Sequence, residues 1–70
     1  MEEVKASMAG NVWKITVNEG EEIEAEQDVV ILESMKMEIP IASQQAGTVK
    51  EIKVAEGDFV NEGDVIVVIE

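Results

Sequence analysis

Few residues of this sequence can carry chemistry, and one lysine stands apart from the others. The chain has no His, Cys, Tyr or Arg, so its titratable side chains are 16 carboxylates and five lysines. Lys36 lies between two methionines, Met35 and Met37. A lysine amine is a nucleophile once it is deprotonated, which makes Lys36 the first candidate for a functional group.

The composition argues against catalysis by the chain itself. Without His or Cys, acid–base catalysis near neutral pH would need a strongly perturbed carboxylate or lysine. A chain of 70 residues buries only about 60% of the surface that its unfolded form exposes, which leaves little interior for such perturbation. The usual ligands of structural metals are also missing. We predict no catalytic residue and no metal site, and a chain on which other enzymes act.

The chain is strongly acidic, with a formal net charge of −11. Negative charge repels nucleic acids and anionic membranes, so neither is an expected partner. Because no signal peptide, membrane-spanning run, lipidation motif or cysteine is visible, we expect a cytoplasmic protein. The length of 70 residues predicts one domain over residues 1–70, and we expect a monomer. The acidic run is interpreted as a solvated face or, alternatively, as a surface that steers the chain toward basic partners. It contains Glu19, Glu21, Glu22, Glu24, Glu26 and Asp28.

The sequence contains an internal repeat. Residues 9–33 align without a gap on residues 46–70, and nine of the 25 positions are identical. Conserved apolar character at further positions predicts that both copies bury the same face, in a fold with quasi-twofold symmetry. The identical pairs are Ala9/Ala46, Gly10/Gly47, Val12/Val49, Ile15/Ile52, Val17/Val54, Glu19/Glu56, Gly20/Gly57, Val30/Val67 and Glu33/Glu70.

Short runs of Val and Ile, separated by Gly and Asn, indicate an all-β fold. Glycine is expected at tight turns, but Glu26 stands where Gly63 lies in the second copy, so either its turn differs or it carries about 1 kcal/mol of left-handed strain. Pro40 should lie at a sheet edge or bulge. The predicted strands are Val12–Val17, Val29–Glu33, Met37–Ile41, Thr48–Val54 and Val65–Ile69, with shorter pieces at Glu3–Ser7 and around Ile23 and Val60.

The segment between the two copies is where function is expected. A hairpin turn at Met35 and Lys36 is the shortest way to connect its flanking strands, and it would project the lysine into solvent. Neither residue is the Asn or Gly that such a turn prefers, so the turn would be strained. The methionines can also be interpreted as gap-fillers at the rim of a thin core. Trp13 and Phe59 are assigned to a partly exposed strand position and to loop packing, respectively.

These features resemble the biotinyl/lipoyl attachment domain family, most closely its stand-alone members. The resemblance covers essentially the whole chain. It rests on the Met-Lys-Met motif within Glu33-Ser34-Met35-Lys36-Met37, on Gly-x-Val-x-x-Ile-x-Val at 10–17 and 47–54, and on the second-half turn at 57–64. The resemblance implies a flattened barrel, or barrel-sandwich hybrid, of two four-stranded antiparallel sheets with the modified lysine on an end turn.

For function, the resemblance implies a biotin carrier. A biotin protein ligase would form biotinyl-adenylate, and the amine of Lys36 would attack its carbonyl to give an amide. The partners would then be the biotin carboxylase and carboxyltransferase components of a biotin-dependent carboxylase. Residues of the recognition motif would be Glu33, Ser34, Met35, Met37 and Glu38, of which Glu33, Ser34 and Glu38 can also be interpreted as merely soluble surface.

Two alternatives remain open from the sequence. The first is a lipoyl carrier, or a dual biotin/lipoyl acceptor, modified on the same lysine by a lipoyl ligase and serving a 2-oxo acid dehydrogenase-type complex. In that branch of the family the residue before the lysine is typically Asp, where this chain has Met35. The second is an unmodified interaction module that docks a basic partner through its acidic face.

Overall fold

The β-branched runs form eight strands, and no helix is present. The computed structural model describes all residues, 1–70. The fold contains no helix that could cross a membrane. The strands are β1 (Glu2–Lys5), β2 (Gly10–Ile15), β3 (Glu22–Ile23), β4 (Asp28–Ser34), β5 (Met37–Ala42), β6 (Gly47–Ile52), β7 (Phe59–Val60) and β8 (Val65–Ile69).

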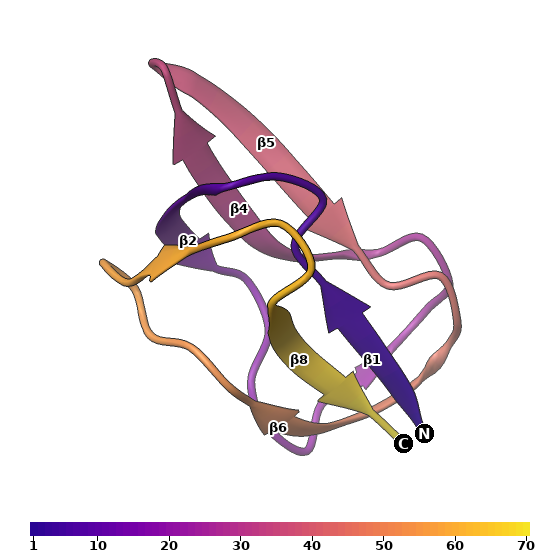
Figure 1. The fold of residues 1–70 in the computed structure, drawn as a ribbon. Coiled ribbons are helices and arrows are strands. Elements are labelled where there is room, and N and C mark those ends of the chain that lie inside the picture. The colour runs from indigo at the N-terminus through magenta and orange to yellow at the C-terminus, as the bar shows by residue number, and fades with distance from the viewer.

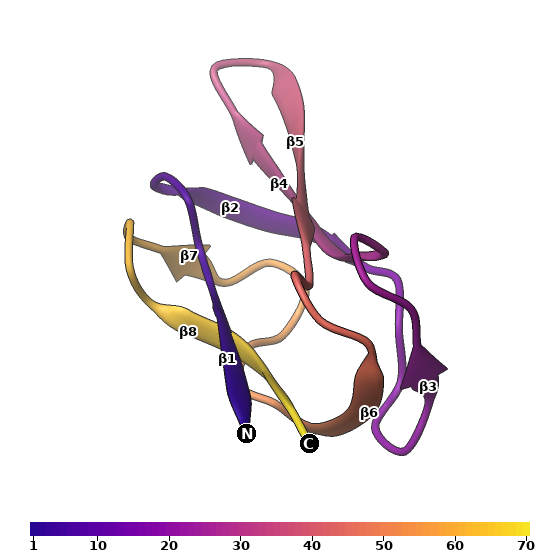
Figure 2. The ribbon, with the colours of Figure 1, turned by 90° about the vertical axis from the view of Figure 1, so that its right-hand side faces the viewer.

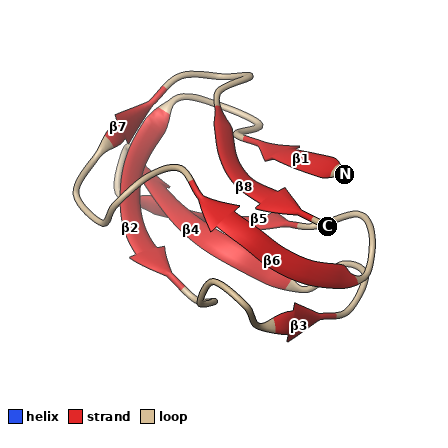
Figure 3. Cartoon of the chain, turned by 90° about the horizontal axis from the view of Figure 1, so that it is seen from below, coloured by secondary structure: helices blue, strands red, loops and turns tan.

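The strands form two four-stranded antiparallel sheets, which do not close into a continuous barrel. One sheet has the order β1-β8-β6-β3 and the other β5-β4-β2-β7, so each sheet contains strands from both halves of the chain (Figures 1 and 3). A single cluster of 14 buried residues forms the core, with Leu32 and Ile66 among its largest fully buried members. The predicted all-β, two-sheet architecture is confirmed.

The two halves have the same strand register. Val12 pairs with Leu32 between β2 and β4, and the residues 37 positions later, Val49 and Ile69, pair between β6 and β8. Both pairings are followed by a bulge at the same position, between Val12 and Lys14 in one and between Val49 and Glu51 in the other. Hydrophobic repetition in the sequence therefore corresponds to quasi-twofold symmetry of the backbone.

Strands β2 and β6 end two residues earlier than the sequence suggests, at Ile15 and Ile52. At these ends a carboxylate from the other half takes the place of a neighbouring strand. Ile15 N–H donates to the Glu56 carboxylate at 3.0 Å, and Ile52 N–H donates to the Glu19 carboxylate at 3.0 Å. Each strand end is thus capped by a carboxylate of the other copy, in a symmetric exchange between the two halves.

The structure confirms the predicted positions of Pro40 and Trp13 but not that of Phe59. Pro40 lies in β5, an edge strand, as predicted, so its missing N–H removes no ladder bond from a central strand. Phe59 was predicted to pack in a loop, and this is wrong. It forms part of β7 opposite Asn11, and its side chain is 62% exposed because it points away from the core. Trp13 is half-exposed on β2, as expected.

Glu26 adopts the turn of its glycine counterpart and carries the strain. Its φ is 67°, close to the 89° of Gly63. Both residues donate a backbone N–H to the equivalent carbonyl, Ser43 for Glu26 and Ala6 for Gly63. The turn is therefore conserved, and a side chain occupies a left-handed position that favours glycine.

This strain predicts a stabilising substitution. Glu26→Gly is expected to raise the free energy of unfolding by about 0.5–1 kcal/mol, because relief of left-handed strain exceeds the entropy that glycine adds to the unfolded chain. Urea denaturation would measure the change. Glu62→Gly, at an exposed turn position without positive φ, is the matched control and should lower stability. An equal loss of unfolding free energy in both variants would contradict the interpretation that Glu26 carries left-handed strain.

Candidate functional site

Strands β4 and β5 form a hairpin whose tip is Met35 and Lys36. Pairing continues to the end of the strands, from Leu32 with Ile39 through Glu33 with Glu38 to Ser34 with Met37. Only two residues are therefore left to reverse the chain. Figure 2 shows this hairpin extending beyond the other strands, at the end of the molecule opposite both termini.

The tip has a backbone conformation that its residues disfavour. Met35 has a φ of 52° and Lys36 a φ of 65°. Positive φ at both central residues of a two-residue loop is the signature of a type I′ turn, whose twist matches that of the flanking strands. Neither residue is Gly, Asn or Asp, so each costs about 1–2 kcal/mol of left-handed strain. The predicted strain is present, and the long, fully paired hairpin maintains it.

The side chains at the tip are exposed. Met35 is 91% exposed and Met37 65% exposed, and Lys36 is exposed between them. Both methionines lie outside the core cluster, so they are not gap-fillers. The chain's one ion pair joins Lys53 to Glu51. No carboxylate therefore lies within 4.0 Å of the Lys36 amine. The amine is thus available to an enzyme approaching from solvent.

The rest of the predicted motif lies just below the tip. Glu33 and Glu38 face each other across the hairpin and are both exposed, while Ser34 is half-buried. Their side chains make no hydrogen bond or ion pair, and each is therefore free to contact a partner. The structure brings the six residues of the segment onto one projecting hairpin.

Sequence reasoning missed Gly10, which supports the base of this hairpin. A Cβ atom at Gly10 would lie 2.9 Å from the Glu33 carbonyl oxygen and 3.5 Å from Ser34 Cβ. Only glycine therefore lets β2 begin this close to the hairpin. Its counterpart Gly47 has the same role beside Glu70, where a Cβ would lie 2.6 Å from the carbonyl oxygen. The conservation of this glycine between the two copies was the available signal.

The quasi-twofold symmetry is broken at this hairpin. By the repeat, Glu70 corresponds to Glu33, so the position equivalent to the Lys36 turn falls at the two chain termini, where Glu2 pairs with Ile69. Figure 1 shows N and C side by side at the end away from the hairpin. Among residues 1–70, Lys36 is the one lysine that lies on a turn.

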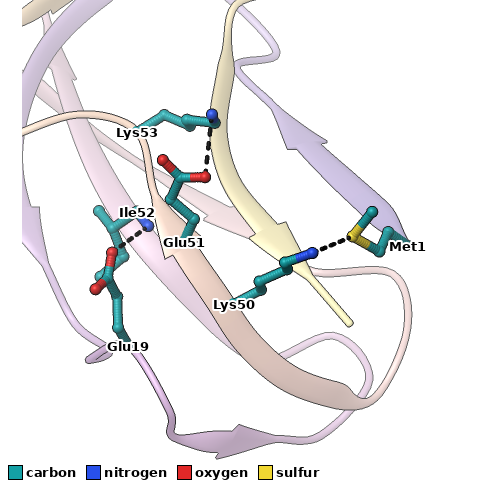
Figure 4. A network of polar contacts seen from close by, with 6 residues as sticks. All are labelled: Met1, Glu19, Lys50, Glu51, Ile52 and Lys53. Carbon is teal, nitrogen blue, oxygen red and sulfur yellow. Dashed lines mark hydrogen bonds and ion pairs between the residues drawn. The ribbon is translucent and has the colours of Figure 1, made fainter.

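Other surface features offer less chemistry. Two other lysines make polar contacts: the Lys50 amine lies 3.2 Å from the Met1 sulfur, and Lys53 pairs with Glu51 at 3.1 Å (Figure 4). No group of three or more carboxylates is arranged to hold a metal ion. A shallow hollow between β1 and β5 is lined by Glu2, Glu3, Val4, Lys5, Ala42 and Gln44.

Comparisons with known proteins agree on one family. The sequence model of the family described as "Biotin-requiring enzyme" matches residues 2–69. The biotin/lipoyl attachment protein of Bacillus subtilis is 62% identical over 63 residues, covering 90% of this chain and 86% of that protein. The biotinylated protein TB7.3 homolog of Mycobacterium leprae is 43% identical, covering 97% of this chain and 96% of that protein.

The fold has a close counterpart among solved structures. The urea carboxylase of Kluyveromyces lactis contains a region that superimposes with a TM-score of 0.93 at 33% identity. The match covers 99% of this chain and only 6% of the carboxylase chain. The same two-sheet unit therefore occurs as a small part of a much larger protein.

Proposed function

The chain belongs to the biotin/lipoyl attachment domain family, and on that premise we propose that this carrier domain holds biotin as an amide on Lys36. The observation that carries the proposal is the geometry of the hairpin tip. Lys36 is exposed on a two-residue turn at the far end of the molecule, between two exposed methionines. No other lysine of the chain occupies a turn.

The carrier contributes position, and the modifying enzyme contributes the chemistry. A lysine amine is mostly protonated in neutral water, so a biotin protein ligase has to remove the proton and supply an activated acyl group. The amine then attacks the carbonyl carbon of biotinyl-adenylate, a C–N bond forms, and the adenylate leaves. Neither catalytic acid nor base is required of this chain.

Attachment turns the lysine into a long, flexible arm. Tethering replaces free diffusion of the cofactor by an effective concentration in the millimolar range. A carrier of this kind suits a biotin-dependent carboxylase, in which a biotin carboxylase component loads a carboxyl group and a carboxyltransferase component removes it. The superposition on part of a urea carboxylase supports this class of partner.

Lipoate is the second candidate cofactor, and one observation favours it. The Bacillus subtilis relative, at 62% identity, is named for both biotin and lipoyl attachment. A lipoyl group would be attached to the same amine by the same type of acyl transfer. The methionine before Lys36 supports biotin, because lipoyl members of the family typically have Asp at that position.

A pair of acylation assays separates the two cofactors. The purified chain is incubated with ATP and either biotin and a biotin ligase, or lipoate and a lipoyl ligase, and kcat/KM is measured for each. We expect a higher kcat/KM for biotinylation than for lipoylation. Met35→Asp should shift the ratio of the two kcat/KM values toward lipoylation. Faster lipoylation of the unaltered chain would overturn the choice of biotin, and no acylation by either ligase would overturn the carrier function.

A further inference from the structure

The thioethers beside Lys36 are the oxidisable groups of the hairpin. The chain has four methionines and no cysteine, so methionine provides its only sulfur atoms. Met35 and Met37 are 91% and 65% exposed and lie outside the core. Packing does not require them, and nothing in the fold shields them from small oxidants.

These two side chains lie where an acylating enzyme must make contact, a step that rests on the proposed function. Acyl transfer needs the activated carbon within about 3–3.5 Å of the Lys36 nitrogen. At a two-residue turn, the residues on either side of the lysine are then covered by the enzyme. Flexible apolar thioethers are well suited to fill an apolar recess on such a partner.

We infer that Met35 and Met37 form a redox-sensitive modification site that controls whether Lys36 accepts an acyl group. The oxidant is hydrogen peroxide. Its O–O bond breaks, one oxygen atom forms an S=O bond with the thioether, and the sulfur loses two electrons while the peroxide is reduced to water. The product, methionine sulfoxide, is polar and is reduced back by the methionine sulfoxide reductases.

The consequence follows from desolvation. A sulfoxide oxygen buried against a surface shaped for a thioether loses its hydrogen bonds to water. We expect kcat/KM for acylation of Lys36 to fall by about tenfold or more when both methionines are oxidised. Since neither side chain belongs to the core, the unfolding midpoint should stay unchanged. This separates the effect from simple damage to the fold.

The chain contains its own control. Met1 is 84% exposed, so peroxide reaches it as readily as Met35, but it lies at the end of the molecule away from the hairpin (Figures 1 and 4). Its sulfur contacts the Lys50 amine and not Lys36. Oxidation of Met1 is therefore expected to leave acylation unaffected.

The experiment treats the purified chain with hydrogen peroxide and locates sulfoxides by peptide mass spectrometry. Acylation by biotin ligase is then timed, before and after incubation with both reductases. Met1→Leu and the double variant Met35→Leu/Met37→Leu are treated in parallel. Peroxide should slow acylation of the unaltered chain and of Met1→Leu, and reductase should restore both. The double variant should lose its sensitivity to peroxide.

The experiment distinguishes a failure of the proposed carrier function from a failure of the redox inference. If the untreated chain accepts no biotin or lipoate, the proposed function is wrong. If the untreated chain is acylated and its fully oxidised form reacts at the same rate, the redox inference is wrong. If the double variant is itself a poor acceptor, the oxidised unaltered chain still provides a test. Its acylation rate should return after treatment with the reductases, and a rate that stays low would overturn the redox inference.

Discussion

Lys36→Arg is expected to abolish acylation of the chain while leaving its fold and stability unchanged. Arginine keeps the positive charge and much of the length of lysine, but its guanidinium stays protonated in proteins and is not an acyl acceptor. Because the Lys36 side chain is exposed and makes no ion pair, its replacement removes no stabilising contact. Intact mass after incubation with ligase, biotin and ATP would measure the loss.

Lys14→Arg provides the matched control for this prediction. Lys14 is also exposed, but it lies within β2 in the ladder opposite Ile31 and not on a turn. Its substitution should leave one acyl group on the chain at the normal rate. Residual acylation of Lys36→Arg, or loss of acylation in Lys14→Arg, would show that the acceptor is a different lysine.

Gly10→Ala is expected to impair both stability and acylation, whereas Gly47→Ala should impair stability alone. A Cβ at Gly10 collides with the Glu33 carbonyl at 2.9 Å, and a Cβ at Gly47 collides with the Glu70 carbonyl at 2.6 Å. Forcing an added methyl group into such a contact typically costs about 1–3 kcal/mol. Both variants create a backbone collision at corresponding positions of the symmetric fold, and Gly47→Ala adds a contact of 2.7 Å with the buried Ile69 side chain.

Their effects on acylation should differ because only Gly10 supports the lysine hairpin. Moving Glu33 and Ser34 shifts the base of the turn that presents Lys36, and displacements near 1 Å in a reacting geometry cost up to about a hundredfold in rate. We expect kcat/KM to fall about tenfold in Gly10→Ala under conditions where both variants are fully folded. Equal acylation rates in the two folded variants would exclude a positioning role for Gly10.

Much of the fold follows from local patterns in the sequence. Short runs of Val and Ile predict five of the strands and shorter pieces at the other three, because β-branched side chains suit a pleated, half-buried surface. The gapless repeat also anticipates the symmetric register, since a shift by one residue would expose the face that both copies bury. The two-residue length of the β4–β5 loop predicts a primed turn with positive φ at Met35, and in the structure Lys36 has positive φ as well.

What could not be predicted depends on contacts between residues far apart in the chain. At the ends of β2 and β6, carboxylates from the opposite half accept backbone N–H groups, Glu56 from Ile15 and Glu19 from Ile52. Gly10 matters because β2 and the hairpin base approach within van der Waals distance. Phe59 was assigned to a loop because its run of apolar residues is too short to show a period.

Of the candidate site, the sequence predicts the hairpin, its strain and the lysine at its tip. It does not predict that the methionines leave the core entirely, because exposure of the tip depends on how far the hairpin extends beyond the other strands. That extension makes the tip accessible from solvent.

The most direct test of the account is the intact mass of the protein isolated from the cells that produce it, followed by peptide mapping. We predict one biotinyl group per chain, attached to Lys36. A chain without any acyl group, or with an acyl group on a different lysine, would contradict it.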